Sequence, residues 1–305
     1  MYPSAMNDMS MCANCGKEGN SGDMNTCNKC KMVKYCNVAC KKKHRSKHKK
    51  ACEKRMAELH DVKLFKQPPS QYGDCPICFL PMPFLDTGWR YQSCCGKVIC
   101  SGCMHAPVYD NQGNQVDNKK CPFCRAPAPT SYGNEAERFN ARVKANDAIA
   151  IYSLGCDYRD GECGVRQDYT KALDLWHRAA ELGYADAYTS IGYAYNNGQG
   201  VEVDKKKAMH HYELAAMRGD TVSRHNLGNN EWRAGNMDRA LKHHMIAVKD
   251  GDYDSLNEIK EFYSNGHATK EEYMKALQSY QAFLGEVKSK QRDEAAAADE
   301  DYRYY

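Results

Sequence analysis

The cysteines of this chain are paired and crowded into its first part. Fifteen of the 17 cysteines lie before residue 125. Most of them form pairs separated by two or three residues, a spacing that brings two thiolates onto one metal ion. No apolar run approaches the roughly 18 residues of a membrane span, and the N-terminus has neither a basic start nor an apolar stretch. We therefore expect a soluble intracellular protein, cytoplasmic or nuclear and without a membrane partner, whose cysteines bind metal rather than form disulfides.

The first module, residues 12–52, carries eight sulfur or nitrogen ligands in four pairs. The pairs are Cys12 with Cys15, Cys27 with Cys30, Cys36 with Cys40, and His48 with Cys52. Two tetrahedral zinc ions require eight such ligands. The module has too few large apolar side chains for a core of its own, so metal binding must supply its folding free energy.

The order of these ligands, with Tyr35 before Cys36, resembles the MYND zinc finger. His44 could replace His48, but the seven residues that separate Cys40 from His48 favour His48. The resemblance implies two interleaved zinc ions, held by Cys12, Cys15, Cys36 and Cys40 and by Cys27, Cys30, His48 and Cys52. It also implies that the finger binds a proline-containing peptide.

Basic residues are concentrated in the same region. Residues 1–70 hold 15 Lys and Arg against 6 Asp and Glu, whereas the other 235 residues hold 28 against 33. The run KKKHRSKHKK at residues 41–50 could bind phosphates. No aromatic residues are interleaved with it for base stacking. A solvated helical face is therefore the better interpretation, and nucleic acid is not the expected partner.

A second module, residues 75–125, again carries eight ligands in four pairs. The pairs are Cys75 with Cys78, Cys94 with Cys95, Cys100 with Cys103, and Cys121 with Cys124. Sulfurs on one tetrahedral zinc lie roughly 3.8 Å apart, about the distance between adjacent Cα atoms, so Cys94 and Cys95 can share an ion. Gly96 then lets the chain turn away. A redox function of the C-x2-C pairs would leave the other pairs unexplained.

This module resembles a RING finger of the all-cysteine type. The resemblance implies one zinc on Cys75, Cys78, Cys100 and Cys103 and another on Cys94, Cys95, Cys121 and Cys124. It also implies docking of a ubiquitin-conjugating enzyme, with Ile77 and Pro122 as apolar contacts and Arg125 as the cation that bridges enzyme and ubiquitin. Where RING fingers commonly carry a Trp after the sixth ligand, this chain has Met104 and His105.

The remainder of the chain repeats itself. The segments that begin near Tyr152, Thr189 and His225 align, and a fourth, decayed copy begins at Ser255. Small residues recur at one position (Gly155, Gly192, Gly228) and glycines that would end helices recur at another (Gly183, Gly219, Gly251). Each unit predicts a helix, a turn and a helix, and stacked units form an α-solenoid with a concave binding surface.

The pattern of these repeats resembles Sel-one-like repeats, which are relatives of the tetratricopeptide type. Trp176 and Tyr212 occupy one repeat position and are predicted to be core residues. Cys156 and Cys163 are predicted to be ordinary thiols. The last helix could extend to about Ala298, and we expect the final residues to be disordered. The combination of modules resembles a family of RING–repeat proteins in microalgae.

The expected fold class is two small cross-brace zinc domains followed by an all-α helical-repeat solenoid, with four zinc ions, two per finger. The predicted domains are 12–52 (MYND finger), 53–74 (helix and proline-containing linker), 75–125 (RING finger), 126–133 (linker), 134–290 (repeats) and 291–305 (charged tail). The leading functional hypothesis is a ubiquitin ligase that holds protein substrates through its repeats and MYND finger. The alternative is a non-catalytic scaffold that mediates protein–protein interactions.

Overall fold

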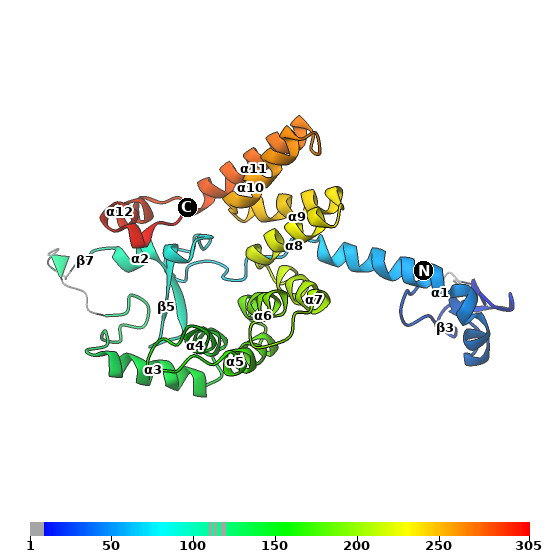
Figure 1. The fold of residues 1–305 in the computed structure, drawn as a ribbon, viewed down its shortest axis with the longest axis horizontal. Helices are drawn as coiled ribbons and strands as arrows, with labels where there is room; N and C mark the ends of the chain where they lie inside the picture. The colour runs from blue at the N-terminus through cyan, green and yellow to red at the C-terminus, as the bar shows by residue number, and fades with distance from the viewer. Residues whose placement is uncertain (1–8, 110–111, 113–114, 117–119) are drawn as a thin grey trace, which may run out of the picture. The chain divides into compact units, whose positions relative to one another are not determined.

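A computed structural model describes residues 9–109, 112, 115–116 and 120–305. A short part of the predicted RING module, residues 110–111, 113–114 and 117–119, therefore lies outside the described residues. The chain divides into two compact units, Met1–Lys66 and Gln67–Tyr305 (Figure 1). In the described part of the chain, no helix is both long enough and apolar enough to cross a membrane.

The first unit consists of two small antiparallel hairpins and one long helix. Its elements are β1 (Met9–Met11), β2 (Glu18–Asn20), β3 (Asn25–Thr26), β4 (Lys34–Tyr35) and α1 (Val38–Leu64). The side chain of Asn37 caps α1 by accepting a hydrogen bond from the backbone N–H of Cys40 at 2.8 Å. The buried cluster of this unit consists of Met24, Tyr35 and four cysteines. The first unit therefore has almost no apolar core apart from its predicted metal ligands.

The second unit begins with the second cysteine-rich finger. Its elements are η1 (Asp86–Gly88), β5 (Trp89–Gln92), β6 (Lys97–Cys100), α2 (Ser101–His105), β7 (Val108–Tyr109) and β8 (Gln115–Val116). Strands β5 and β6 pair antiparallel, with Trp89 opposite Cys100 and Gln92 opposite Lys97. This hairpin has a cysteine pair at each end. Cys94 and Cys95 lie in its turn, and Cys100, which pairs with Cys103, lies where β6 ends and α2 begins.

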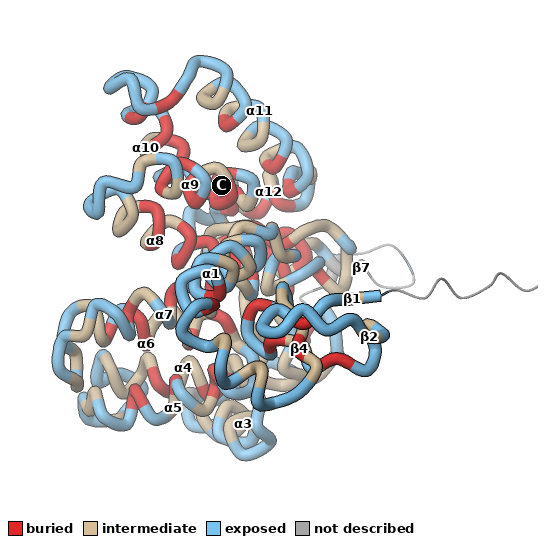
Figure 2. Tube along the Cα trace, turned by 90° about the vertical axis from the view of Figure 1, so that its right-hand side faces the viewer, coloured by how far each residue is buried: buried red, intermediate tan, exposed pale blue. Residues whose placement is uncertain are grey.

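The helical repeats follow α3 (Tyr132–Lys144) as four antiparallel helix pairs (Figure 1). The pairs are α4 (Ala148–Asp160) with α5 (Tyr169–Glu181), α6 (Ala185–Asn197) with α7 (Lys205–Ala216), α8 (Thr221–Arg233) with α9 (Met237–Lys249), and α10 (Tyr253–Ser264) with α11 (Lys270–Val287). Buried and exposed stretches alternate along these helices (Figure 2). This alternation is expected where each helix buries one face against its neighbours.

In each of the first three helix pairs, an aromatic ring of the second helix packs directly on a glycine of the first helix. A β-carbon on Gly155 would lie 2.6 Å from Nε1 of Trp176, and one on Gly192 would lie 2.7 Å from the Tyr212 ring. In the third pair, His244 lies on Gly228 in the same way. These contacts leave no room for a side chain, so the predicted close helix approach has a direct steric cause. Trp176 and Tyr212 are both buried, as predicted.

The segment between the two modules packs against the repeats. Gln71 donates a hydrogen bond to Asp186 at 2.6 Å, and the Tyr72 hydroxyl donates to the same carboxylate. Gln67 donates to Asp250 at 3.0 Å. In the structure these polar contacts hold the predicted proline-containing linker on the repeats. A cavity of about 740 Å³ lies between this segment, residues 81–86 and the repeats.

The C-terminal residues are ordered, contrary to the prediction. Helix α11 ends at Val287, and a separate helix, α12 (Lys290–Ala298), packs against α2 of the second finger. The segment η2 (Glu300–Tyr302) follows, and Tyr304 is fully buried in a cluster with Phe283 and Val287. Apolar burial of Tyr304 is the physical reason why this end of the chain is held in place.

The buried carboxyl of Asp220 predicts a pH dependence of stability. Burial and the neighbouring Asp186 carboxylate raise the pKa of Asp220 from 3.8 to about 7. Between about pH 4 and 7 the folded chain therefore holds a proton that the unfolded chain has lost. The stabilisation from this group is complete below about pH 4 and is lost as the pH rises through 7.

An Asp220→Asn variant tests this dependence. Asparagine keeps the helix cap, in which residue 220 accepts hydrogen bonds from the Ser223 N–H at 2.6 Å and from the Thr189 hydroxyl at 2.7 Å. At pH 8 we expect the variant to be more stable than the wild type by up to a few kcal/mol, and the advantage should vanish near pH 4. Urea unfolding at several pH values measures the difference, and a constant difference across this range would contradict the prediction.

Candidate metal centres

The predicted ligands come together in four groups of four. In each group the ligand atoms all lie within 4.8 Å of one another. The groups are Cys12, Cys15, Cys36 and Cys40; Cys27, Cys30, His48 and Cys52; Cys75, Cys78, Cys100 and Cys103; and Cys94, Cys95, Cys121 and Cys124. Within each finger, the first and third ligand pairs share one group and the second and fourth pairs share the other. This alternation is a cross-brace arrangement.

The distances between the sulfurs fit tetrahedral zinc. Sulfurs bound to one zinc at about 2.3 Å lie roughly 3.8 Å apart. The sulfurs of Cys27 and Cys52 are 3.8 Å apart, and those of Cys78 and Cys100 are 3.7 Å apart. A disulfide would need about 2.05 Å, and all of these cysteines are free. The donor set of thiolates and one imidazole nitrogen is the one that zinc prefers, so the four groups fit four zinc ions.

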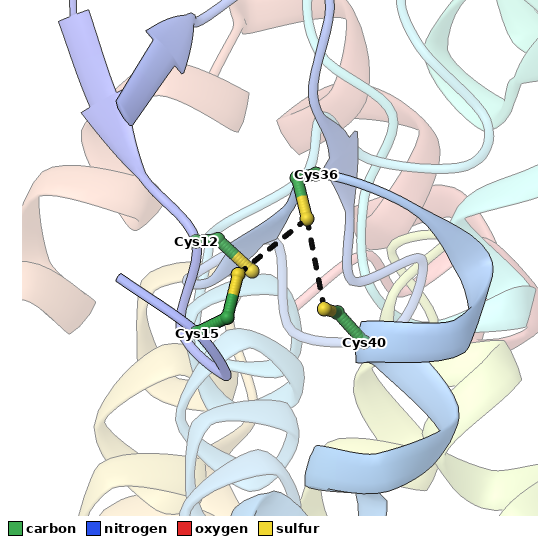
Figure 3. Close-up of side chains that lie close together, drawn as sticks. All are labelled: Cys12, Cys15, Cys36 and Cys40. Carbon is green, nitrogen blue, oxygen red and sulfur yellow. Dashed lines mark hydrogen bonds between the residues drawn. The ribbon is translucent and has the colours of Figure 1, made fainter. Parts of the chain in front are cut away.

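The first group of the first finger is only partly buried: Cys12 is buried, whereas Cys15 is exposed. Figure 3 shows the four side chains converging on a common point, with Cys36 lying between Cys15 and Cys40 at 3.7 and 3.6 Å. Cys12 precedes a turn after β1, and Cys40 lies in the first turn of α1. A backbone hydrogen bond from Cys36 lowers the pKa of the Cys12 thiol to about 6, which favours the thiolate that zinc binds.

The second group of the first finger is buried, and it includes His48 rather than His44. Nε2 of His48 lies 3.2 Å from the sulfur of Cys30. His44, one helical turn earlier, instead places its Nδ1 3.2 Å from the hydroxyl of Tyr35. The rings of His44 and His48 lie nearly parallel, with their centroids 5.9 Å apart.

The second finger holds its first group in a buried position and its second group nearer the surface. Cys75, Cys100 and Cys103 are buried, and the last two flank the first turn of α2. The adjacent pair Cys94–Cys95 lies in one group, and Gly96 follows it with a φ of +70°. A backbone hydrogen bond from Ala126 lowers the pKa of the Cys124 thiol to about 7. Among the described residues, Cys156 and Cys163 belong to no such group.

The predicted enzyme contacts lie on the cysteine loops of the second finger. Ile77 is half-buried and packs on the cluster formed by its cysteines, whereas Pro122 is half-buried and Arg125 is exposed. Two exposed aromatic side chains, which sequence reasoning missed, lie on the same loops: Phe79 is 76% exposed and Phe123 is 42% exposed. Their positions directly after Cys78 and directly before Cys124 could have indicated them.

Comparison with known proteins agrees with two of the three modules. Residues 12–52 match the MYND finger family. These residues are a MYND finger. Residues 148–184 and 185–220 each match the Sel1 repeat family and are Sel1 repeats. The predicted fold class is thus confirmed: a cysteine-rich zinc-binding region is followed by a mostly helical Sel1-repeat solenoid. Sel1 repeats stack into surfaces that bind proteins, so protein partners are expected.

One curated relative and two solved structures are similar to part of this chain. The ERAD-associated E3 ubiquitin-protein ligase component HRD3B of Arabidopsis thaliana is 34% identical over 104 residues, which are 32% of this chain and 16% of that protein. A Sel1 repeat protein from Oxalobacter formigenes is 25% identical over 56% of this chain and 67% of its own, with a TM-score of 0.44. A protective antigen of uropathogenic Escherichia coli is 24% identical over 56% of this chain and 37% of its own, also with a TM-score of 0.44.

Proposed function

We propose that this chain is a RING-type ubiquitin ligase. In this proposal all sixteen grouped residues bind four zinc ions, and residues 75–125 form a RING finger that recruits a ubiquitin-conjugating enzyme. The observation that carries the proposal is the second finger itself. Its two alternating groups of four cysteines hold two loops, and those loops present apolar side chains (Ile77, Phe79, Phe123) beside an exposed arginine, Arg125.

The proposed catalysis relies on positioning. A RING finger contributes no covalent chemistry, so the rate gain must come from holding the ubiquitin thioester in a reactive arrangement. Ile77 and Pro122 would supply an apolar contact for the conjugating enzyme. Arg125, which is exposed and adopts a φ of +62°, would contact both the enzyme and ubiquitin.

The repeats and the MYND finger would bind the protein substrate. Asp147, Asp186 and Asp250, from successive repeats, accept hydrogen bonds from the linker and the second finger. The surface that these residues line is therefore already used within the chain. A substrate of the repeats would use other exposed positions, such as Tyr193 and Trp232. The linker and the proposed finger are thus attached to the repeats that would bind the substrate.

A non-catalytic scaffold is the second candidate, and one observation favours it. Met104 and His105 occupy the place where many RING fingers carry a residue that contacts the enzyme. Met104 accepts a hydrogen bond from Gln92 at 3.4 Å, and the His105 ring lies 6.0 Å from that of Tyr302. Because both side chains already have partners within the chain, this part of the finger would contribute little to an enzyme interface.

Thioester discharge distinguishes the two candidates. The zinc-loaded full-length chain is added to a panel of ubiquitin-loaded conjugating enzymes, and transfer of ubiquitin to free lysine is followed. We expect the wild type to accelerate discharge, and Ile77→Ala and Arg125→Ala to reduce this acceleration by roughly tenfold or more, because small misplacements are costly in a positioning mechanism.

An Arg166→Ala variant is the matched control, since Arg166 is exposed and lies in the repeats. It should leave discharge unchanged. Zinc content is measured for every variant because Ile77 packs on the cysteine cluster. No acceleration by a fully zinc-loaded wild type across the panel would contradict the ligase proposal and leave the scaffold.

A further inference from the structure

Each of the two zinc-ligand groups of the second finger has its own arginine neighbour from the helical part of the chain. Arg142 of α3 donates hydrogen bonds to the carbonyl oxygens of Ser93 and Cys94, at 3.1 and 2.7 Å. Arg292 of α12 lies at the other group, where its Nη2 lies 3.9 Å from the sulfur of Cys78. The two arginines come from the two ends of the repeat region, 150 residues apart in the sequence.

Arg292 is fully buried, with 0% of its surface exposed. Its Nη1 donates to the carbonyl oxygen of Val287 at 2.7 Å, and its Nε is buried without a hydrogen-bond partner. Among the residues that the structure describes, no carboxylate forms an ion pair with it. A buried guanidinium without an anion nearby is strongly destabilising, so the negative charge that compensates Arg292 must come from the group that it contacts.

Zinc binding gives the contacted group that charge, because four thiolates around one Zn²⁺ carry a net charge of −2. Cys75, Cys78, Cys100 and Cys103 form this group, and three of them are buried, so solvent screens the charge only weakly. The guanidinium and the zinc–thiolate group therefore stabilise each other.

A glycine in the second finger leaves room for this arginine. A β-carbon on Gly102, the second residue of α2, would lie 2.8 Å from both the backbone nitrogen and Cγ of Arg292. Only glycine at this position lets α12 approach so closely. The finger also holds the rest of the C-terminal segment: Arg90 donates to the carbonyl oxygen of Asp301 at 2.9 Å, and the Thr87 hydroxyl donates to that of Arg303 at 2.5 Å.

We propose that the zinc group Cys75–Cys78–Cys100–Cys103 is the docking site of the C-terminal segment, residues 289–304, with Arg292 as the residue that senses the metal. The segment binds the finger in its zinc-loaded form, and Arg292 in turn slows the loss of this one zinc ion. The proposal rests on zinc occupancy of the second finger. It does not depend on ubiquitin ligase activity, so either can fail without the other.

Zinc release from the full-length chain tests the proposal. Four zinc ions are expected per chain, and a colorimetric chelator follows their release. Substituting a residue that hydrogen-bonds to a metal ligand typically weakens the affinity for the metal by about 10- to 100-fold. We expect Arg292→Met to release one of the four ions faster by roughly this factor, and Arg292→Lys, which keeps the charge, to fall between Arg292→Met and the wild type. Arg303→Met is the matched control because Arg303 lies in the same segment and is exposed.

Cobalt substitution separates the hydrogen bond from a general loss of packing. An N–H donor on a thiolate lowers the energy of the sulfur lone pair, so its removal should shift the thiolate-to-cobalt charge-transfer band of that centre to longer wavelength. We expect this shift in Arg292→Met and no shift in Arg303→Met. Hydrogen exchange should rise in residues 289–304 of Arg292→Met while all four metals are still bound.

Two results would overturn the proposal. One is Arg292→Met with wild-type zinc release and an unchanged cobalt spectrum. The other is faster release of several ions together, without a spectral shift, because that would indicate general destabilisation. If Arg292→Met does not fold, the same comparison between Arg292→Lys and the wild type decides the outcome, since lysine presents a different donor to the sulfur.

Discussion

Substituting Cys30 by serine is expected to unfold the first finger while the second unit stays folded. Cys30 is buried to 1% exposure, and the cluster around it consists mainly of metal ligands. Binding of structural zinc contributes about 10 to 16 kcal/mol in small zinc domains. Without it, α1 loses the environment of His48 and Cys52, two of its three buried residues, and tertiary packing supplies most of the stability of a helix in a protein.

Metal analysis and hydrogen exchange measure this effect. The zinc content should fall from four ions to three or two, and the amides of residues 9–52 should exchange rapidly. The amides of the repeats should keep their protection, because the chain divides into two compact units after Lys66. Cys163→Ser is the matched control, since Cys163 is exposed and lies outside the four groups. A protected α1 in the Cys30→Ser variant would show that the finger folds without complete metal binding.

Substituting Trp176 by alanine is expected to destabilise the second unit by about 3 to 5 kcal/mol, the usual cost of removing a large buried aromatic side chain. Trp176 is 2% exposed, belongs to the buried cluster of the first two repeats and covers Gly155. Because the facing residue has no side chain, nothing nearby can fill the space that is left. Urea unfolding followed by circular dichroism measures the loss.

Trp232 provides a control of the same residue type. It is 46% exposed, so Trp232→Ala should cost well under half as much as Trp176→Ala. Equal effects of the two substitutions would mean that burial against the repeat glycines does not determine the stability of the array. Zinc content should stay at four ions in both variants, which distinguishes this loss from damage to the fingers.

The repeats and the ligand pairs could be predicted because their information is local. Two cysteines separated by two residues lie close together whatever the rest of the chain does. The recurrence of glycines and large rings follows from one helix pair stacking on the next, so each copy repeats the same steric requirement. The number of zinc groups and the helical class of the second half therefore followed from spacing alone.

Local spacing left other features open. Spacing favoured His48 over His44 but gave no place for His44, whose Nδ1 lies 3.2 Å from the hydroxyl of Tyr35 in the structure. The two exposed aromatic side chains of the second finger were also missed. Their exposure depends on the direction in which each loop turns, which the positive φ of Phe79 illustrates.

By itself, the sequence determined which residues can bind zinc and that the second half is built from helical repeats, since both depend on neighbours within a few dozen residues. Only the tertiary structure decided how the second finger, the linker and the C-terminal segment meet. Gln67 and Asp250 are 183 positions apart, and Cys78 and Arg292 are 214 apart. Such contacts arise from the path of the whole repeat array, which carries the end of the chain back to the finger. No short stretch of sequence encodes that path.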